Sequence, residues 1–173
     1  MYKKFRVSKV VPIALVTAWR VLENKLATKT NMVRRGITVA SSICNLCRVE
    51  EETSSLLFFE CRFAWLLWNH CCVWLGVQGV FHNVPLLNFS QFRMSNAPTL
   101  MDEVWGGIWI AVVNEVWRHR NRVIFKGGGV DVLDAFTLVQ LKTWYWVSSK
   151  SQSAFFSFSD WCLDPMVCIM MIL

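Results

Sequence analysis

The sequence predicts a mainly α-helical fold: a small helical domain with a zinc-knuckle-like insert, made of a β-turn and a short strand that carry cysteines. Three observations predict it. Apolar residues recur at helical spacing in several segments, which are separated by Gly- and Pro-containing breaks. Three cysteines cluster within one non-helical stretch, at Cys44, Cys47 and Cys61. Finally, 54% of the 173 residues are apolar and ten are Trp, which is ample material for a core.

The first helix is predicted from Pro12, a residue suited to the first turn of a helix. The apolar residues after it recur every three or four positions, at Leu15, Trp19, Leu22 and Leu26. Thr28 is then placed to cap a second, short helix, which we expect to end before Gly36.

The cysteine insert begins with a pair of thiols separated by two residues, Cys44 and Cys47. A tight turn between such a pair points both sulfurs at one ion. An acidic run follows (50–52), then an apolar run (56–59) that we expect to form a strand, and then Cys61. Tetrahedral zinc takes four such ligands, so the insert supplies three of them and predicts zinc as the cofactor.

The fourth ligand is missing from this pattern. The strand before Cys61 contains no ligand, and His70 lies nine residues further along a predicted helix, about 13 Å away. Ligands of one ion lie within about 4 Å of each other, so His70, Cys71 and Cys72 are poor substitutes. Glu60 or water could fill the position weakly. The alternative is three buried thiols without a metal.

A further helix is expected after Cys61, with apolar residues mostly on one face at Phe63, Leu66, Leu67 and Trp74. These aromatics could stack on unpaired bases, but at helical spacing we expect them in the core. From Gly76 to Pro98 the periodicity fades, which predicts an irregular loop or linker.

A long helix is predicted next, opened by Thr99 and Asp102 as a capping box. Its core face carries Trp105, Ile108, Val112 and Val116. Gly127 to Gly129 break the chain, and Asp131 is placed to cap a last helix with Val132, Phe136, Val139 and Trp146 on its buried side. The apolar tail from Trp161 to Leu173 either packs back or frays. We expect two parts, a zinc-binding-like domain at 1–125 and a C-terminal helix and apolar tail at 126–173.

Several of these segments together carry a family resemblance. The quoted pieces are VPIALVTAWRVLENKLATKTNMVRRGI, CNLC, EETSSLLFFECRFAWLLW and VWRHRNRVIF, and the tail FSFSDWCLDP also fits. The stretch from Val11 to Phe125 resembles the zinc-binding domain near the C-terminus of reverse transcriptases of plant non-LTR (LINE-type) retrotransposons. In that family a His precedes the hydrophobic pair that leads to the last cysteine. The family context is Glu-Ser/Thr-x-x-His-Leu-Phe. Here Glu52, Thr53, Leu57 and Phe58 match it, and Leu56 stands where the His belongs.

Charge is distributed unevenly along the chain. Residues 1–48 hold ten Lys or Arg against one acid, Glu23, so their net charge is +9. The remainder of the chain carries −3, which gives the overall net charge of +6. A basic segment beside a thiolate knuckle suits a polyanion, either RNA or DNA. The arginines that we expect to contact phosphate are Arg34, Arg35, Arg118, Arg120 and Arg122. The alternative is a solvated basic surface and cations that favour the C-terminal ends of two helices.

Enzymatic and membrane functions are not predicted. The chain has no Gly-x-x-x-x-Gly-Lys loop, no Gly-x-Ser-x-Gly elbow and no paired aspartates of a polymerase site. The basic, apolar start imitates a signal peptide, but Lys9 and Pro12 interrupt it; the apolar stretch from Phe63 to Phe81 contains polar residues that argue against a membrane span. Seven cysteines, an odd number, argue against a secreted disulfide framework. We expect an intracellular protein, with the nucleus as one option, and no small-molecule substrate; the oligomeric state is left open.

The function implied by the resemblance is non-catalytic binding of nucleic acid, which helps a parent reverse transcriptase hold RNA or target DNA. The alternative is a degenerate element fragment, or a structural or protein-interaction module, that binds neither metal nor nucleic acid.

Overall fold

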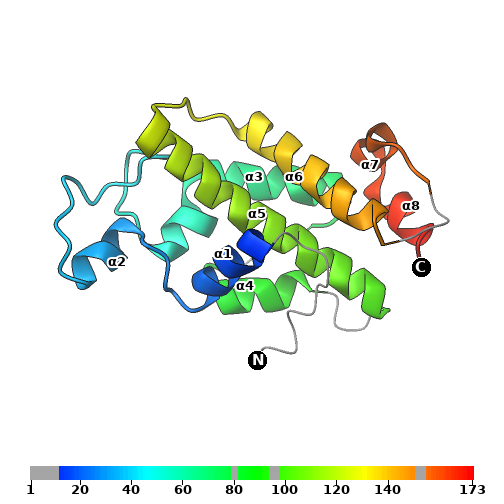
Figure 1. Ribbon diagram of the computed structural model, residues 1–173, viewed down its shortest axis with the longest axis horizontal. Coiled ribbons are helices and arrows are strands. Elements are labelled where there is room, and N and C mark those ends of the chain that lie inside the picture. The colour runs from blue at the N-terminus through cyan, green and yellow to red at the C-terminus, as the bar shows by residue number, and fades with distance from the viewer. Residues whose placement is uncertain (1–11, 79–81, 94–97, 151–154) are drawn as a thin grey trace.

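A long central helix, α5 (Thr99–Lys126), organises the fold (Figure 1). The structure is a computed structural model that describes residues 12–78, 82–93, 98–150 and 155–173. The other elements are α1 (Pro12–Leu22), α2 (Lys29–Arg34), the π-helical turn η2 (Leu56–Glu60), α3 (Arg62–Trp74), α4 (Pro85–Phe92), α6 (Val132–Ser148), α7 (Phe158–Leu163) and α8 (Pro165–Met170). The prediction of a mainly α-helical fold is confirmed.

Helix α5 is surrounded by the other elements. Every residue from 104 to 116 is buried, because α1 and α4 pack on it from one side and α3, α6 and η2 from the others. Its predicted core face, from Trp105 to Val116, is therefore buried as expected. The helix ends at Gly127, whose φ of 63° is the left-handed conformation that glycine adopts without strain.

The start of α5 differs from the prediction. The N-cap is Pro98 and no side chain caps the helix, so the predicted capping box of Thr99 and Asp102 is wrong. The Asp102 carboxylate instead forms an ion pair with Arg93, which follows α4. The Asp102 carboxylate, which the sequence pattern assigned to the cap of the helix, is therefore paired with Arg93 instead.

The helices α2, α3 and α6 form where the sequence predicts them, and α1 begins at Pro12 as predicted but ends at Leu22, before Leu26. Thr28 caps α2 by accepting a hydrogen bond from the Asn31 N–H, and Gly36 follows the helix with a φ of 76°. Asp131 caps α6 by accepting from the Asp134 N–H at 3.0 Å. Local capping chemistry therefore fixes these boundaries.

The segment from Gly76 to Pro98, predicted to be irregular, contains helix α4. Its buried residues include Phe89 and Phe92, whose rings lie 4.9 and 5.1 Å from Trp109 and Trp105 of α5. Asn88 also accepts a hydrogen bond from the Trp109 indole at 2.8 Å. Aromatic packing on α5 stabilises a helix that is too short to show a clear periodicity in the sequence.

The apolar tail packs back onto the core, which decides between the two predicted options. The side chain of Trp161 is fully buried, and its indole donates to Thr143 of α6 at 3.1 Å. A capping box of Ser157 and Asp160 opens α7. Helix α6 in turn packs on α3 and α5, so one core cluster extends on both sides of the predicted boundary after residue 125.

The predicted strand at 56–59 is wrong, because these residues form the π-helical turn η2. The Cys61 N–H donates to the Leu56 carbonyl at 2.8 Å, five residues back. All four residues from 56 to 59 are buried, whereas a strand would turn alternate side chains to opposite faces. Within the described ranges, the one β-bridge joins Ile43 and Glu51.

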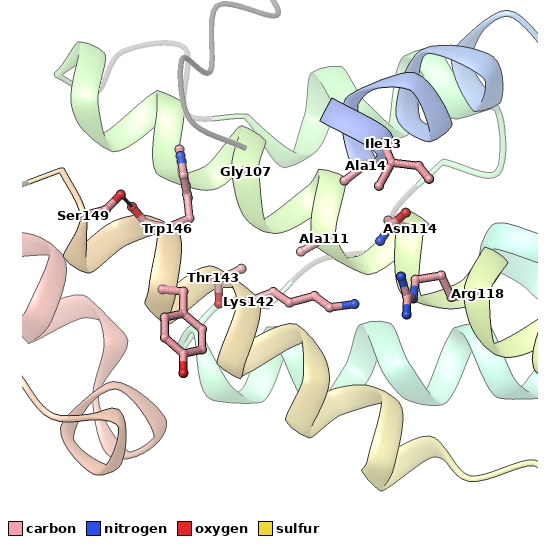
Figure 2. Close-up of a pocket in the computed structure, with 11 residues that line it drawn as sticks. Ile13, Ala14, Gly107, Ala111, Asn114, Arg118, Lys142, Thr143, Trp146 and Ser149 are labelled. Atoms are coloured by element: carbon pink, nitrogen blue, oxygen red, sulfur yellow. Dashed lines mark hydrogen bonds between the residues drawn. The ribbon is translucent and has the colours of Figure 1, made fainter. Parts of the chain in front are cut away.

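One glycine of α5, Gly107, allows α6 to approach it closely. A Cβ built on Gly107 would lie 2.2 Å from the Trp146 ring, whereas one on Gly106 would meet no atom within 4 Å. Figure 2 shows Trp146 beside this part of α5. In the part of the chain that the structure describes, no helix combines the length and apolarity needed to cross a bilayer.

Candidate metal centre

The loop that carries Cys44 and Cys47 is shaped by main-chain hydrogen bonds. The Cys44 N–H donates to the Glu50 carbonyl and the Glu52 N–H to the Ser42 carbonyl, both at 2.8 Å. The Arg48 N–H donates to the Cys44 carbonyl at 2.8 Å, and Arg48 adopts a φ of 60° to close the turn. The two ends of the loop are thereby held together, and both cysteines face the same side.

The third cysteine, Cys61, reaches this loop from the junction between η2 and α3. It is the last residue of the π-type hydrogen bond to Leu56 and the N-cap of α3. The Trp65 N–H donates back to the Cys61 carbonyl at 2.9 Å, which begins the helix. The position of Cys61 therefore depends on a turn and a helix that are both packed on the core.

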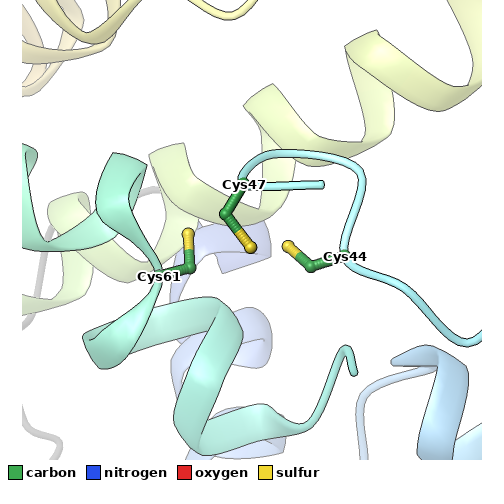
Figure 3. A group of neighbouring side chains, drawn as sticks. All are labelled: Cys44, Cys47 and Cys61. Carbon is green, nitrogen blue, oxygen red and sulfur yellow. The ribbon is translucent and has the colours of Figure 1, made fainter. Parts of the chain in front are cut away.

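The three sulfurs converge. The Sγ atoms of Cys44, Cys47 and Cys61 all lie within 4.8 Å of one another, as Figure 3 shows. Thiolates on a tetrahedral zinc ion lie about 2.3 Å from the metal, and hence about 3.8 Å from each other. Cys44 and Cys61 are buried, Cys47 is half-buried, and all three are free thiols. The predicted trio of ligands is thus brought together with the spacing that one ion needs.

A hydrogen bond between Cys44 and Cys61 makes these two thiols differ in acidity. The Cys61 thiol and the main-chain N–H groups of Cys47 and Leu46 lower the pKa of Cys44 to about 6, against the opposing effect of burial. The same hydrogen bond, together with burial, raises the pKa of Cys61. Cys44 is therefore the more acidic of these two thiols, and a metal ion would replace the proton on Cys61.

A fourth protein ligand does not complete the cluster. Among the His, Cys, Asp and Glu side chains of the described residues, only the three cysteines bring their ligand atoms together. His70 stacks on Phe136 at 5.4 Å, and Cys71 and Cys72 are buried in α3, as expected of poor substitutes. Glu60 lines an open cavity of about 380 Å³ next to Cys47 and Cys61, so this side of the cluster is open to water.

A buried carboxylate, to which the sequence analysis gave no structural role, ties the cysteine loop to the rest of the fold. Glu52 is fully buried; its Oε1 accepts from Arg120 Nη2 at 2.6 Å and from the Lys29 N–H at 3.1 Å. The Glu52 carbonyl also accepts from the Thr30 hydroxyl at 3.0 Å. One residue at the end of the loop therefore joins α2 and α5.

The five predicted phosphate-binding arginines have different surroundings. Arg34 and Arg35 are exposed at the end of α2, and Arg35 donates to the Lys25 carbonyl at 2.8 Å. Arg118 is exposed and lies 3.6 Å from the Glu115 carboxylate. Arg120 is buried on Glu52, and Arg122 pairs with Asp134 at 2.6 Å. In this arrangement the last two serve internal ion pairs, which the basic sequence WRHRNR could not indicate because both acidic partners are distant in sequence.

One exposed aromatic lies beside the cluster. Trp65, in a helix whose aromatics we expected in the core, is 57% exposed and lines the open cavity together with Arg62, Val49 and Cys61. The helical pattern could have indicated this, since Trp65 falls off the face defined by Phe63 and Leu67.

Comparison with known proteins gives one family. Residues 2–68 match the family model described as zinc-binding in reverse transcriptase. The matched segment contains all three cysteines and confirms the resemblance to a zinc-binding domain of reverse transcriptase over that range. No curated protein and no solved structure matches the chain.

Proposed function

From the premise that residues 2–68 match the reverse transcriptase zinc-binding family, we propose that the chain is a non-catalytic nucleic-acid-binding module built around a structural zinc site. Cys44, Cys47 and Cys61 would hold the ion, with water or Glu60 in the fourth position. The ion would supply a cross-link between the loop and the start of α3, and no reaction chemistry. The observation that carries the proposal is the convergence of three sulfurs inside the matched segment.

Nucleic-acid binding is supported by exposed cations and an exposed ring on the same part of the chain. Arg34 and Arg35 lie at the end of α2, which Glu52 joins to the cysteine loop. Arg62 and Trp65 lie at the open side of the cluster. Cations neutralise phosphates and an exposed indole stacks on an unpaired base, which together favour single strands. LINE-type ancestry, a plant source and a nuclear location belong to this proposal as well.

The second candidate is a degenerate fragment or a protein-interaction module. It is favoured by Leu56, which occupies the position where the resemblance expects a His, and which leaves three protein ligands. It is also favoured by exposed apolar side chains on the last two helices, of which Leu163 is 84% and Met170 is 63% exposed. This candidate binds neither zinc nor nucleic acid.

Metal content and salt-dependent RNA binding separate the two candidates. The proposed function expects one zinc per purified chain and an affinity for single-stranded RNA that falls steeply between low and high salt. The double variant Arg34→Gln/Arg35→Gln should reduce the slope of log K against log salt by about 0.7 for each lost phosphate contact. Arg20→Gln, which removes one exposed cation on α1, is the control for a change of charge outside this surface. A metal-free chain that does not bind RNA would support the second candidate.

The fourth ligand is tested at position 56. The Cys61 N–H donates to the Leu56 carbonyl, so residue 56 lies close to Cys61 in space. Leu56→His should therefore raise zinc affinity by supplying an imidazole. Leu56→Gln places a polar side chain at the same buried position without an imidazole, and should not raise it. Competition titration with a zinc chelator measures both variants, and equal zinc affinity in Leu56→His and the wild type would show that this position is not the missing ligand.

A further inference from the structure

A second cavity lies away from the cysteines, between α1, α5 and α6 (Figure 2). It measures about 280 Å³, just below the range of about 300–1,000 Å³ typical of sites for small ligands. Ile13 and Ala14 of α1, Gly107 and Ala111 of α5, and the indole of Trp146 form its apolar walls. The cavity therefore has room for one flat, mostly apolar group.

One end of this cavity carries an amide without a partner. Asn114 is 5% exposed and lines the cavity, and its side chain makes no hydrogen bond to any residue that the structure describes. An amide in such a place offers both a donor and an acceptor. The amide is thus available to a ligand with a matching donor and acceptor on one edge.

The same end carries excess positive charge. Lys142 of α6 and Arg118 of α5 both line the cavity, and both pair with the carboxylate of Glu115. Two cations on one carboxylate leave a net charge of about +1 at this end. Arg118 keeps 61% of its side chain exposed, so it is accessible to an anion at the surface.

We propose that this cavity binds one adenine nucleotide. Its base would lie among the Ala14, Ala111 and Trp146 side chains, with its edge on the Asn114 amide and its phosphate near Arg118. An asparagine amide pairs in a bidentate manner with the N6 and N7 positions of adenine. The two-ring purine also buries more apolar surface against the Ala111 and Trp146 side chains than a pyrimidine ring would, which favours this base. The nucleotide could be free or an unstacked member of a single strand. Only the strand source rests on the proposed function.

Titration of adenosine monophosphate into the full chain, followed by calorimetry, tests the cavity. We expect saturable binding that uridine monophosphate and ribose 5-phosphate do not reproduce. Asn114→Leu should weaken binding about tenfold to hundredfold by removing the paired amide. Ala111→Leu should block the cavity without changing charge, and Arg20→Gln should leave binding unchanged. Thermal melting shows whether each variant is folded.

A ten-residue oligoadenylate distinguishes the sources and separates the two proposals. Displacement of the strand by adenosine monophosphate would assign the cavity to a strand nucleotide, and binding without displacement would assign it to a free nucleotide. Suppose that the strand binds through Arg34 and Arg35, and that neither Asn114→Leu nor Ala111→Leu changes the affinity for the strand or for adenosine monophosphate. This result would overturn the cavity site and leave the proposed function intact. If adenosine monophosphate binds in a way that depends on Asn114 but the strand does not bind, the cavity site is supported and the proposed function is overturned.

Discussion

The cysteine loop and the packing of α5 on α6 differ in what they bury. Between residues 42 and 52 the loop has little regular structure, and its fully buried groups are the Cys44 thiol and the Glu52 carboxylate. Along α5, by contrast, residues 104 to 116 are all buried and mostly apolar. The helix pair therefore gains stability from apolar burial, whereas the loop depends on hydrogen bonds, an ion pair and, in the proposed function, a metal. One chain thus combines a helix pair held by apolar packing with a loop held mainly by polar contacts.

Removal of a cluster thiol should have the largest effect and should be confined to the loop. Cys44→Ser is expected to abolish stoichiometric zinc and to let the amides of residues 42–52 exchange as in an open segment, while α5 keeps its protection. Hydrogen exchange read by mass spectrometry checks both. Cys168→Ser changes a buried thiol outside the cluster and should leave the loop protected. Equal exchange in the two variants would mean that the loop is held without metal.

Arg120→Leu tests the link between the two regions. It leaves the Glu52 carboxylate buried without its cation and should lower the free energy of unfolding by about 3–5 kcal/mol. Urea unfolding measures this loss. The double variant Glu52→Leu/Arg120→Leu removes both charges, so it should lose less than the sum of the single changes. Additive losses would contradict a direct pair.

The close approach of α6 to α5 is tested at two adjacent glycines. Gly107→Ala places a Cβ against the Trp146 ring and should lower the free energy of unfolding by about 1–3 kcal/mol. Gly106→Ala meets no atom within 4 Å and should raise it by about 0.5–1 kcal/mol, because alanine favours the helix. Thermal unfolding of both variants gives the comparison, and similar losses at both positions would show that ring contact is not the cause.

The smallest expected effect is a pH dependence at His119, which lies on α5 between the two regions. Burial and the neighbouring Arg122 lower its pKa below the ordinary value of 6.5, and Asp131 N–H donates to its Nε2 at 3.1 Å. The unfolded chain therefore binds more protons between the lowered pKa and 6.5, so stability rises with pH across that window and the contribution of His119 is complete above 6.5. Urea unfolding at several pH values should show a weaker rise in His119→Gln, which does not titrate.

The sequence predicted the parts of the fold that depend on local chemistry. The caps at Thr28 and Asp131, the break at Gly127 and the core face of α5 follow from residue type and spacing alone. The strand at 56–59 and the capping box at Thr99 were wrong because a buried apolar run fits either a strand or a helical turn, and because Arg93 competed for Asp102. Tertiary packing decided both.

The candidate site divides in the same way. The spacing of the two knuckle cysteines predicted a pair of converging thiols, and Cys61, after the apolar run, was predicted as the third ligand; the structure brings all three together. The ion pair of Glu52 and Arg120 could not be predicted, since its members are 68 residues apart in the sequence. The cavity at Asn114 was also beyond reach, because its walls come from three helices.

Helix α5 carries Arg120, Asn114 and Gly107 along one uninterrupted rod, with about 20 Å between the first and the last. The residue that holds the cysteine loop and those that line the nucleotide cavity therefore share one rigid support. If an ion at one end alters the affinity for a ligand at the other, thermodynamic reciprocity requires the ligand to alter the affinity for the ion by the same factor.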